Sequence, residues 1–376
     1  MLALVLIALR QTVADETDDR LQTIAQSGPR GEGAAAAQQA ARELSNSGIE
    51  ILPRLLSAMD TDNIVAANWY RTVYEQVTRR ELQSPSPQLP VKFLKEFVRD
   101  AQHRGRSRRL VLSLLDRFDE GFRKEFVLTQ IDDAEFRSDA VAALLAKGDQ
   151  LQKEEQTDEA ARVYEAAFRG ARESDQIQAA AAKLKEIGRE VSIIDHMGFV
   201  TDWHVIGPFD APGKTGFELS FPPEEQVDLA ANYPGQGGRE ITWKRYRTPQ
   251  ALGEVNLVTA IAPCTEAVGY AYTEIISPRD QDVELRCGAD DNLSVCVNEE
   301  KVFSRLQWLN GTRLDRFTAP VHLRRGKNTV LVKICQGPQH SNPSVPNNWS
   351  MQLRFCDKEG AGVGIHSALP ELPETE

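Results

Sequence analysis

The sequence predicts a protein of two parts, an α-helical N-terminal region followed by an antiparallel β-sandwich of the jelly-roll type. Up to about residue 198, apolar residues recur at the period of an amphipathic helix. Beyond that point, apolar and polar residues alternate in short runs bounded by turn residues, without helical intervals. With 376 residues, of which 41% are hydrophobic, the chain is long enough for two or three domains with cores of their own.

The N-terminus carries an apolar run over residues 2–9, shortly before Ala14. The run is too short to cross a bilayer, and it predicts a signal peptide cleaved after Ala14. No Lys or Arg precedes the run, which leaves a short buried helix as the alternative. A signal peptide implies an exported protein, periplasmic or extracellular, without a transmembrane segment in the mature chain. Residues 15–33 are polar and contain Gly-Pro-Arg-Gly, which predicts a linker.

Residues 34–146 carry successive helical patterns separated by turn signals. Apolar stripes predict helices that begin near residues 34, 51, 64, 93 and 110. Pro53 falls in the first turn of the second helix, where its missing N–H is tolerated. Gly48, an Asp-Thr-Asp-Asn turn at 60–63 and a Ser-Pro-Ser-Pro sequence at 84–87 separate the helices.

The end of the helical region carries two resemblances to known repeats. Segment 128–145 holds an Asp-Asp turn and then Arg-Ser-Asp-Ala-Val-Ala-Ala-Leu-Leu from Arg137, and it resembles a HEAT-type helical repeat. Residues 55–77 resemble the same unit more loosely. The resemblance implies that region 34–146 stacks helix pairs, because one pair cannot bury its own apolar face. Residues 147–195 resemble one tetratricopeptide-style hairpin, with small and large side chains alternating through Gly148, Ala160, Tyr164, Ala167 and Phe168.

Region 198–362 reads as eight short strands. Runs of period two bounded by turn residues are typical of an antiparallel sandwich or jelly roll rather than an α/β fold. After it, residues 363–376 are rich in proline and acidic residues, which predicts a disordered tail. The strands are expected at 202–206, 242–246, 271–276, 283–287, 293–297, 320–323, 329–334 and 350–355.

All the cysteines lie in the predicted sandwich: Cys264, Cys287, Cys296, Cys335 and Cys356. No CxxC or Cys/His spacing is present, which speaks against a zinc site. Strand alternation places Cys287 on the apolar face and the last three cysteines on the face away from the core. A disulfide among those three is left open, and the odd count leaves at least one free thiol.

Three motifs carry a further resemblance. The first is Trp-His-Val-Ile-Gly-Pro-Phe-Asp at 203–210, and the second runs from Glu284 through Gly-Ala-Asp-Asp-Asn to Val302. The third is Leu-Arg-Arg-Gly-Lys-Asn from Leu323, which leads into a strand. Together they resemble the galactose-binding-like and PA14-like β-sandwich modules. Combined with HEAT-like helices, they resemble large exported proteins of planctomycete-type bacteria, a likeness that implies a fold and a binding role.

One position departs from that family pattern. The usual Asn-Gly of the second turn is Asn298-Glu299 here. Because glycine's ease with positive φ is lost, we expect a turn of another type. By contrast, the Gly-Lys-Asn at 326–328 can supply a turn that needs positive φ.

The resemblance points to Asp290, Asp291 and Asn292 as ligand-binding residues. In the sugar-binding branch of PA14-like lectins, adjacent aspartates hold a calcium ion that holds sugar hydroxyls, so Asp290 and Asp291 become candidate calcium ligands. Calcium takes six to eight oxygen ligands, and only these are visible locally. The alternative is a capped turn whose side chains bond nearby backbone N–H groups and keep the strands in register.

Two tryptophans are candidate platforms for a sugar ring. Trp308 lies in a polar, loop-like sequence, and Trp349 begins a strand after a proline-rich loop. Large aromatic side chains pack in cores more often than they bind ligands, and we expect that of Trp203.

The sequence predicts no catalytic residues. His204, His322 and His340 lack a nucleophile partner pattern, and no Gly-x-Ser-x-Gly sequence is present. The net charge of −11 speaks against nucleic acid as a partner, and the arginines at 104, 106, 108 and 109 are expected to form a solvated helix entry. The prediction is a non-enzymatic exported protein that binds a protein partner, carbohydrate or both. A purely structural protein, or an accessory or catalytic component of polysaccharide breakdown, is the alternative.

Overall fold

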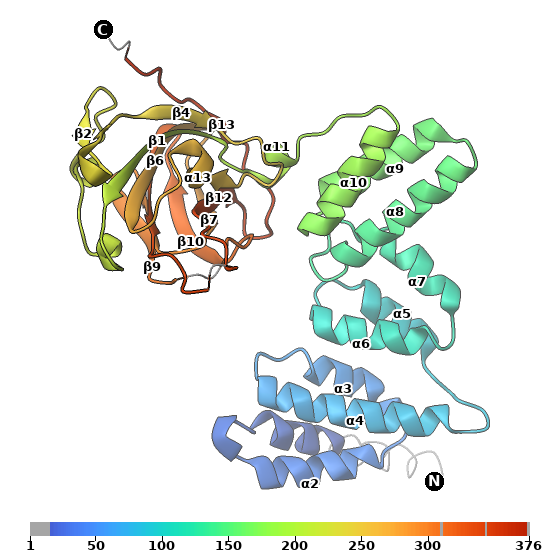
Figure 1. Ribbon diagram of the computed structural model, residues 1–376. Coiled ribbons are helices and arrows are strands. Elements are labelled where there is room, and N and C mark those ends of the chain that lie inside the picture. Colours follow the sequence, from blue (N-terminus) through green and yellow to red (C-terminus); the bar gives the residue numbers. More distant parts are fainter. Residues whose placement is uncertain (1–15, 309–310, 343, 374–376) are drawn as a thin grey trace, which may run out of the picture. The chain divides into compact units, whose positions relative to one another are not determined.

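The computed structural model describes residues 16–308, 311–342 and 344–373 (Figure 1). The chain divides into two compact units after Ala146, within helix α8. The first unit is all helical. The second contains a helical hairpin and the β-sandwich. No helix of the described residues is long and apolar enough to cross a membrane. The predicted signal peptide, residues 1–14, lies outside the described residues.

The first unit follows the predicted helical pattern and adds a helix before it. Residues 16–25 are helical, so the predicted linker at 15–33 is wrong over that part. Burial of Leu21 and Ile24 explains the helix, and the Tyr70 hydroxyl donates to the Leu21 carbonyl over 2.8 Å. The later helices are α2 (Ala34–Ser45), α3 (Leu52–Ala58), α4 (Ile64–Leu82), α5 (Val91–Arg99), α6 (Gly105–Leu115), α7 (Glu120–Val127) and the start of α8 (Arg137–Lys153).

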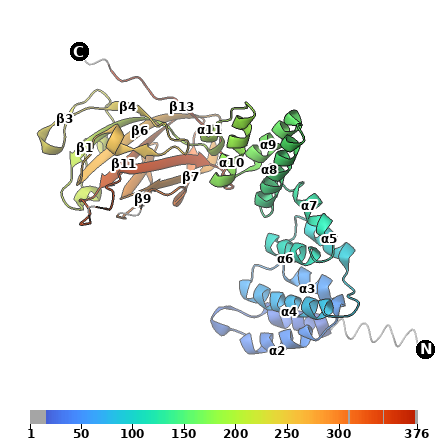
Figure 2. The same ribbon diagram turned by 45° about the vertical axis from the view of Figure 1, so that its right-hand side comes forward.

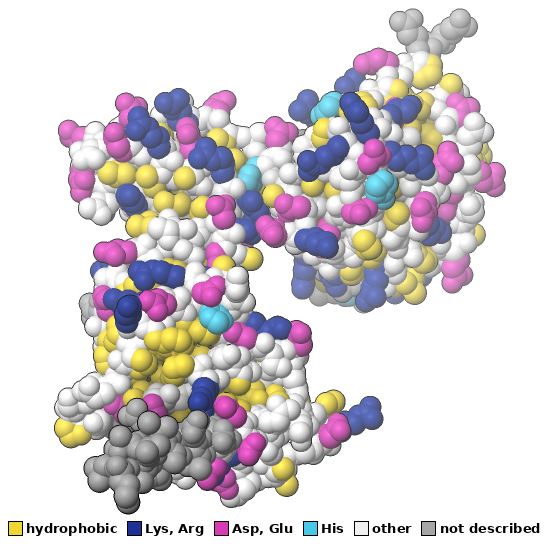
Figure 3. Space-filling view, turned by 180° about the vertical axis from the view of Figure 1, so that it is seen from behind, with side chains coloured by type: hydrophobic (Ala, Val, Ile, Leu, Met, Phe, Trp, Pro, Cys, Tyr) yellow, Lys and Arg dark blue, Asp and Glu magenta, His cyan; other side chains and the backbone are white. Residues whose placement is uncertain are grey.

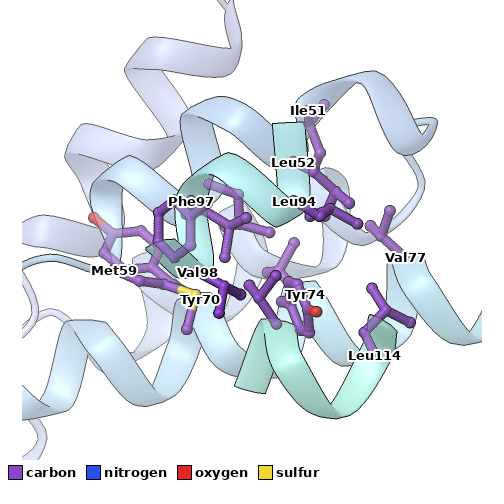
Figure 4. Close-up of a cluster of buried hydrophobic side chains, with 14 of the residues drawn as sticks. Ile51, Leu52, Met59, Tyr70, Tyr74, Val77, Leu94, Phe97, Val98 and Leu114 are labelled. Carbon is purple, nitrogen blue, oxygen red and sulfur yellow. The ribbon is translucent and has the colours of Figure 1, made fainter. Parts of the chain in front are cut away.

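One core holds these helices together. Its apolar side chains come from every helix up to α7. Figure 4 shows the part of this core that lies between Ile51 and Leu114 in the sequence. Asn63 caps α4 by accepting from the N–H groups of Val65 and Ala66, and its amide donates to the Ser27 carbonyl. The cap therefore fixes both the start of α4 and the path of the preceding chain.

The arginine cluster at the start of α6 is paired with carboxylates except at Arg106, which is exposed, so the predicted solvated helix entry is wrong for the other three arginines. Arg108 is 2% exposed, and its guanidinium donates to the Val98 carbonyl and lies 2.6 Å from a carboxylate oxygen of Asp133. Arg109 bridges Glu135 and Asp139 at 2.5 and 2.9 Å. These pairs link α6 to the turn before α8, which local sequence cannot show.

The second unit begins with an antiparallel helical hairpin. The end of α8 is followed by α9 (Thr157–Gly170), α10 (Ser174–Glu186) and the short α11 (Ile193–Met197). Gly148 lies against Tyr164 so closely that a Cβ there would come within 2.3 Å of the ring. The Tyr164 hydroxyl donates to Asp149 over 2.7 Å. The small and large residues seen in the sequence thus meet across the hairpin.

The sandwich consists of two antiparallel sheets that lie face to face (Figures 1 and 2). One has the order β4-β1-β6-β11-β8-β9, with β13 also paired to β6, and the other the order β10-β7-β12-β5. The first sheet contains β1 (Asp202–Asp210), β4 (Lys244–Arg247), β6 (Ala267–Ser277), β8 (Leu293–Val297), β9 (Glu300–Arg305), β11 (Gly326–Gln336) and β13 (His366–Ser367). The second contains β5 (Val255–Asn256), β7 (Gln281–Ala289), β10 (Phe317–Leu323) and β12 (Ser350–Cys356).

All eight predicted strands are present, most of them longer than predicted. The side chains that alternation predicted to face the core do so. Val330 lies opposite Val297 and Val332 opposite Val295, all in the core between the sheets. Strand β9 was missed because its residues are half-buried or exposed. A small third sheet pairs β2 (Tyr233–Pro234) with β3 (Glu240–Ile241).

A second apolar cluster covers the outer face of the larger sheet. Segment 211–243 folds over that face and includes α12 (Pro222–Glu225). Cys335 points away from the inner core as predicted, yet it is 1% exposed because it lies in this outer cluster. Cys287 is in the inner core. All five cysteines are free thiols, so the disulfide left open by the sequence is not formed.

Two further predictions are corrected by the backbone. Asn298 and Glu299 both have positive φ, 51° and 70°, so the β8–β9 turn keeps the left-handed geometry although it lacks glycine. Asn298 tolerates it because its side chain accepts from the Thr329 N–H and donates to Asn328. The predicted disordered tail is ordered up to residue 373: β13 pairs with β6, and the Pro370 carbonyl bonds His204.

Candidate functional site

The turn Asp290–Asn292 joins β7 to β8 and holds two other loops in place. Asp290 Oδ1 accepts from the Gly311 N–H over 2.6 Å, and Asp291 Oδ2 accepts from the Gly337 N–H over 2.8 Å. Asn292 Oδ1 accepts from the Gln307 N–H over 2.5 Å. All three side chains are buried. The structural role foreseen as the alternative, bonding to backbone N–H groups, is therefore present, although the bonded groups lie far away in sequence.

The side chain of Gln307 also hydrogen-bonds to the turn. Its amide donates to the carbonyls of Ala289 and Asp291 over 2.8 and 3.2 Å. Gln307 is itself buried, at 8% exposure. The turn, the segment after β9 and the segment after β11 thus form one polar cluster at this end of the sandwich.

That cluster is only partly satisfied. Within the described part of the chain, three of its side chains and Gln336, the residue before Gly337, have buried polar atoms without a hydrogen-bond partner: Asp290 Oδ2, Asn292 Nδ2, Gln307 Oε1, and both amide atoms of Gln336. Buried polar groups are almost always paired with protein, ordered water or a ligand, and an unpaired one costs about 1–3 kcal/mol. We call these four side chains the unpaired cluster. Their polar atoms suit a partner that both donates and accepts.

Burial raises the pKa of Asp290 above its ordinary value, and the hydrogen bond from the Gly311 N–H opposes that rise only in part. Among the described residues, no cationic side chain forms an ion pair with Asp290 that would compensate for the burial of its carboxylate. The electrostatics therefore favour a proton, a cation or a hydroxyl donor at Oδ2.

Trp308 borders the cluster and is half-buried. Its ring lies so near Gly337 that a Cβ there would approach within 2.9 Å. The Lys214 ammonium lies 5.2 Å from the ring centroid, a cation–π contact. A sugar that stacked on that face would have to displace Lys214.

Trp349 is a core residue, which corrects its prediction as a ligand platform. It is 1% exposed, and its indole N–H donates to the Ile334 carbonyl over 3.3 Å. The ring also packs on Gly269, where a Cβ would come within 2.7 Å. Burial leaves no ring face for a sugar. Trp203 is buried at 0% exposure, as expected for a core residue.

The candidate calcium ligands are not joined by further acids. In the described part of the chain, no three His, Cys, Asp or Glu side chains gather as a metal site would require. Asp290 and Asp291 each already accept a backbone N–H. Calcium would need most of its six to eight oxygens from backbone, amide groups and water.

A second charged network, missed from the sequence, lies on β7 and β12. Arg354 is 1% exposed; its guanidinium contacts Asp315 at 2.5 and 2.7 Å and donates to the carbonyls of Met197 and Gly360. Arg286 lies 3.3 Å from Asp315. Burial would raise the pKa of Asp315, but the two guanidinium groups outweigh it and hold the pKa below its ordinary value. Every charge here is compensated.

No family model and no curated protein matches the chain. Solved structures similar to it include a family 35 carbohydrate-binding module from an environmental isolate, with 12% identity and a TM-score of 0.22 over 46% of this chain and 93% of that one. A family 2 glycosyl hydrolase from Bacteroides cellulosilyticus has 12% identity and a TM-score of 0.27 over 43% and 20%. A β-glucosidase from Kluyveromyces marxianus has 11% identity and a TM-score of 0.26 over 46% and 21%. The matched region spans about a fifth of each hydrolase.

Proposed function

We propose that this chain is a non-enzymatic exported protein whose β-sandwich binds carbohydrate at the unpaired cluster. The observation that carries the proposal is the concentration of buried, unpaired polar atoms on Asp290, Asn292, Gln307 and Gln336 beside Trp308. Sugar hydroxyls both donate and accept, so they match this set of one carboxylate oxygen and several amide atoms. A fully structural turn would have no need of unpaired atoms, since each weakens the fold.

Asp290, Asn292 and Trp308 each have a defined part in this proposal. Asp290 Oδ2 accepts from a sugar hydroxyl, and Asn292 Nδ2 donates to one. The Trp308 ring offers an apolar face once Lys214 moves aside. A calcium ion would be held by Asp290 and Asp291 together with backbone carbonyls and water, and it would supply a cation for sugar hydroxyls.

A glycan array probed with and without calcium tests this function. The wild-type chain should bind one class of glycan, and Asp290→Ala should weaken binding at least about tenfold, the effect of losing a charged hydrogen bond. Asp282→Asn is the matched control, because Asp282 lies on β7 with a 92% exposed side chain. It should bind as the wild type does. If no glycan binds and calcium does not raise Tm, the carbohydrate function is excluded.

One observation favours the structural alternative. The three side chains of the turn each hold a backbone N–H of another segment, which by itself accounts for their burial. In that case the sandwich is a scaffold for partner docking. A role in polysaccharide breakdown needs two carboxylates across a glycosidic bond. It requires hydrolysis of a polysaccharide panel that is lost when particular carboxylates are replaced.

For the helical region we propose a protein-binding role. Its helix pairs share one core in the first unit, in the manner of stacked HEAT-like repeats, and the tetratricopeptide-like hairpin opens the second. Stacked helical pairs present extended surfaces to other proteins.

A further inference from the structure

Helices α4 and α6 line two adjoining hollows on the surface of the first unit. The larger, about 350 Å³, and the smaller, about 200 Å³, share Leu110 and Ser113 in their walls. They therefore make one groove, which we call the α4–α6 groove. Along α4 its lining runs from Ala67 to Leu82. At 1.5 Å per residue this is roughly 22 Å, the length of a helix of about 15 residues.

Apolar side chains are spaced along the groove, among its arginines and other polar residues. Met59 and Ala67 lie at one end, Leu110 in the middle, and Leu82 and Leu114 at the other end. Figure 3 shows that this unit exposes a patch of hydrophobic side chains with Lys or Arg side chains beside it. Apolar side chains spaced in this way suit the apolar face of a peptide.

The charges of the groove are mainly positive, although the chain as a whole carries −11. Its walls hold five arginines but only two acids, Glu75 and Glu135. Each acid is paired with an arginine of the groove, at 2.8 and 2.5 Å. The arginines are Arg71, Arg79, Arg106, Arg109 and Arg117.

Arg71 and Arg109 are paired with the two acids and Arg106 donates to the Thr61 carbonyl, which leaves two arginines of the groove. Arg79 on α4 and Arg117 just after α6 are exposed, and neither forms an ion pair with any residue that the structure describes. Both line the smaller hollow. Carboxylates of a partner would form ion pairs with these two arginines, since guanidinium groups bind carboxylates in bidentate pairs.

A buried hydroxyl in the same hollow also lacks a partner. Tyr74 lines it and is 2% exposed, yet its hydroxyl makes no hydrogen bond within the described part of the chain. Figure 4 shows Tyr74 beside Leu114, which lines the same hollow. A peptide carbonyl or carboxylate that entered there would accept from it.

We infer that the α4–α6 groove binds an acidic peptide segment of another protein, with apolar side chains on the floor and Asp or Glu side chains against Arg79 and Arg117. This inference rests on the proposed protein-binding role of the helical region and gives it a place and a partner chemistry. Positive charge on the rim selects the sign of the partner, because like charges placed there are repelled.

Selection from a phage-displayed library of random peptides of about 15 residues, panned on the full chain, tests the inference. Enriched peptides should be rich in Asp and Glu together with Leu, Ile or Phe. Arg79→Glu/Arg117→Glu should weaken their binding at least about tenfold, and higher salt should weaken binding to the wild type. Because both side chains are exposed and unpaired, the double variant should keep the wild-type Tm.

Arg42→Glu/Lys92→Glu is the matched control, since it makes the same charge change at exposed positions of α2 and α5 outside the groove. It should bind the peptides within about twofold of the wild type, as distant surface charges are screened. Enriched peptides without acidic bias, or binding that both double variants weaken equally, overturn the inference.

Hydrogen–deuterium exchange of the full chain with the best peptide separates the two proposals. Protection of α4 and α6 supports the groove. Protection confined to other helices overturns the groove while the protein-binding role stands. Protection only in the sandwich, or a library without enriched peptides, overturns both.

Discussion

Two acidic residues of the sandwich, Asp315 and Asp290, have opposite surroundings. Asp315 precedes β10 and lies between the guanidinium groups of Arg354 and Arg286. Asp290 follows β7, is 4% exposed and has only the Gly311 N–H for one of its two oxygens. The pKa of Asp315 is held below its ordinary value, whereas burial raises that of Asp290.

The difference separates a fully paired network from a turn that is paired only in part. Around Asp315, each charge has a counter-charge and the arginine bonds two carbonyls of distant segments, so the network joins β12 to the end of α11 and to the turn at Gly360. Around Asp290, four side chains keep unpaired buried atoms. Unpaired atoms weaken a fold, so we expect them where another partner binds.

The largest effect should come from breaking the paired network. Arg354→Met leaves Asp315 with Arg286 as its one, more distant ion-pair partner. It also removes the hydrogen-bond donor of the Met197 and Gly360 carbonyls. Removal of one member of a buried ion pair costs about 3–5 kcal/mol, and we expect that loss in the free energy of unfolding measured with urea. Arg324→Met, at an exposed arginine, should change it by less than about 0.5 kcal/mol. A loss below about 1 kcal/mol for Arg354→Met would contradict the role given to the network.

Two glutamines of the sandwich allow the same comparison, between a hydrogen-bonded and an unpaired buried side chain, without a change of charge. Gln352 donates to the Leu252 carbonyl and only its Oε1 is unpaired, whereas Gln336 is 2% exposed and neither of its amide atoms has a partner among the described residues. Gln352→Leu should therefore lower the free energy of unfolding by about 1–3 kcal/mol, and Gln336→Leu should leave it unchanged or raise it. Thermal unfolding of both variants at one pH measures this. Equal losses would mean that Gln336 has a partner of its own in solution.

The smallest effect is a difference in pH dependence between Asp290 and Asp315. The raised pKa of Asp290 means that its contribution to stability is present below pH 3.8, the unfolded value, and is lost as pH rises through the folded pKa. The Asp290→Asn variant should therefore gain stability relative to the wild type as pH rises, by about 1 kcal/mol.

For Asp315 the sign reverses. Its lowered pKa means that its contribution is present above pH 3.8 and is lost as pH falls through the folded pKa. The loss in free energy of unfolding that Asp315→Asn causes, relative to the wild type, should therefore become smaller as the pH falls. Urea unfolding of both variants across the acid range, against the wild type, measures the two trends. Parallel trends would show that the two carboxylates do not differ as the geometry indicates.

Much of the sandwich could be predicted because alternation along a strand is a local property. Val295 and Val297 face the core together since side chains on one strand repeat with a period of two. Strand β9 escaped prediction because its residues are not cleanly divided between buried and exposed. The turn at Asn298 was misjudged because the contacts that stabilise its positive φ come from β11, across the sheet.

The candidate site was predicted only in part, for the same reason. Asp290, Asp291 and Asn292 were recognisable as a turn, but Gln307 and Gln336 gave no local signal. They belong to segments that meet the turn only in the folded sandwich. Trp349 was proposed as a ligand platform because sequence cannot tell an exposed strand end from a covered one.

By itself, the sequence determined the order of the main helices and of eight strands, and the face of each of those strands on which a residue lies. Cys335, for example, was placed away from the inner core by its parity alone. Only the tertiary structure decided that this outer face is covered by segment 211–243, so that the thiol is buried, and that Arg108 and Arg109 of α6 are paired. Periodicity depends on neighbouring residues, whereas burial and charge pairing depend on which distant segments pack together.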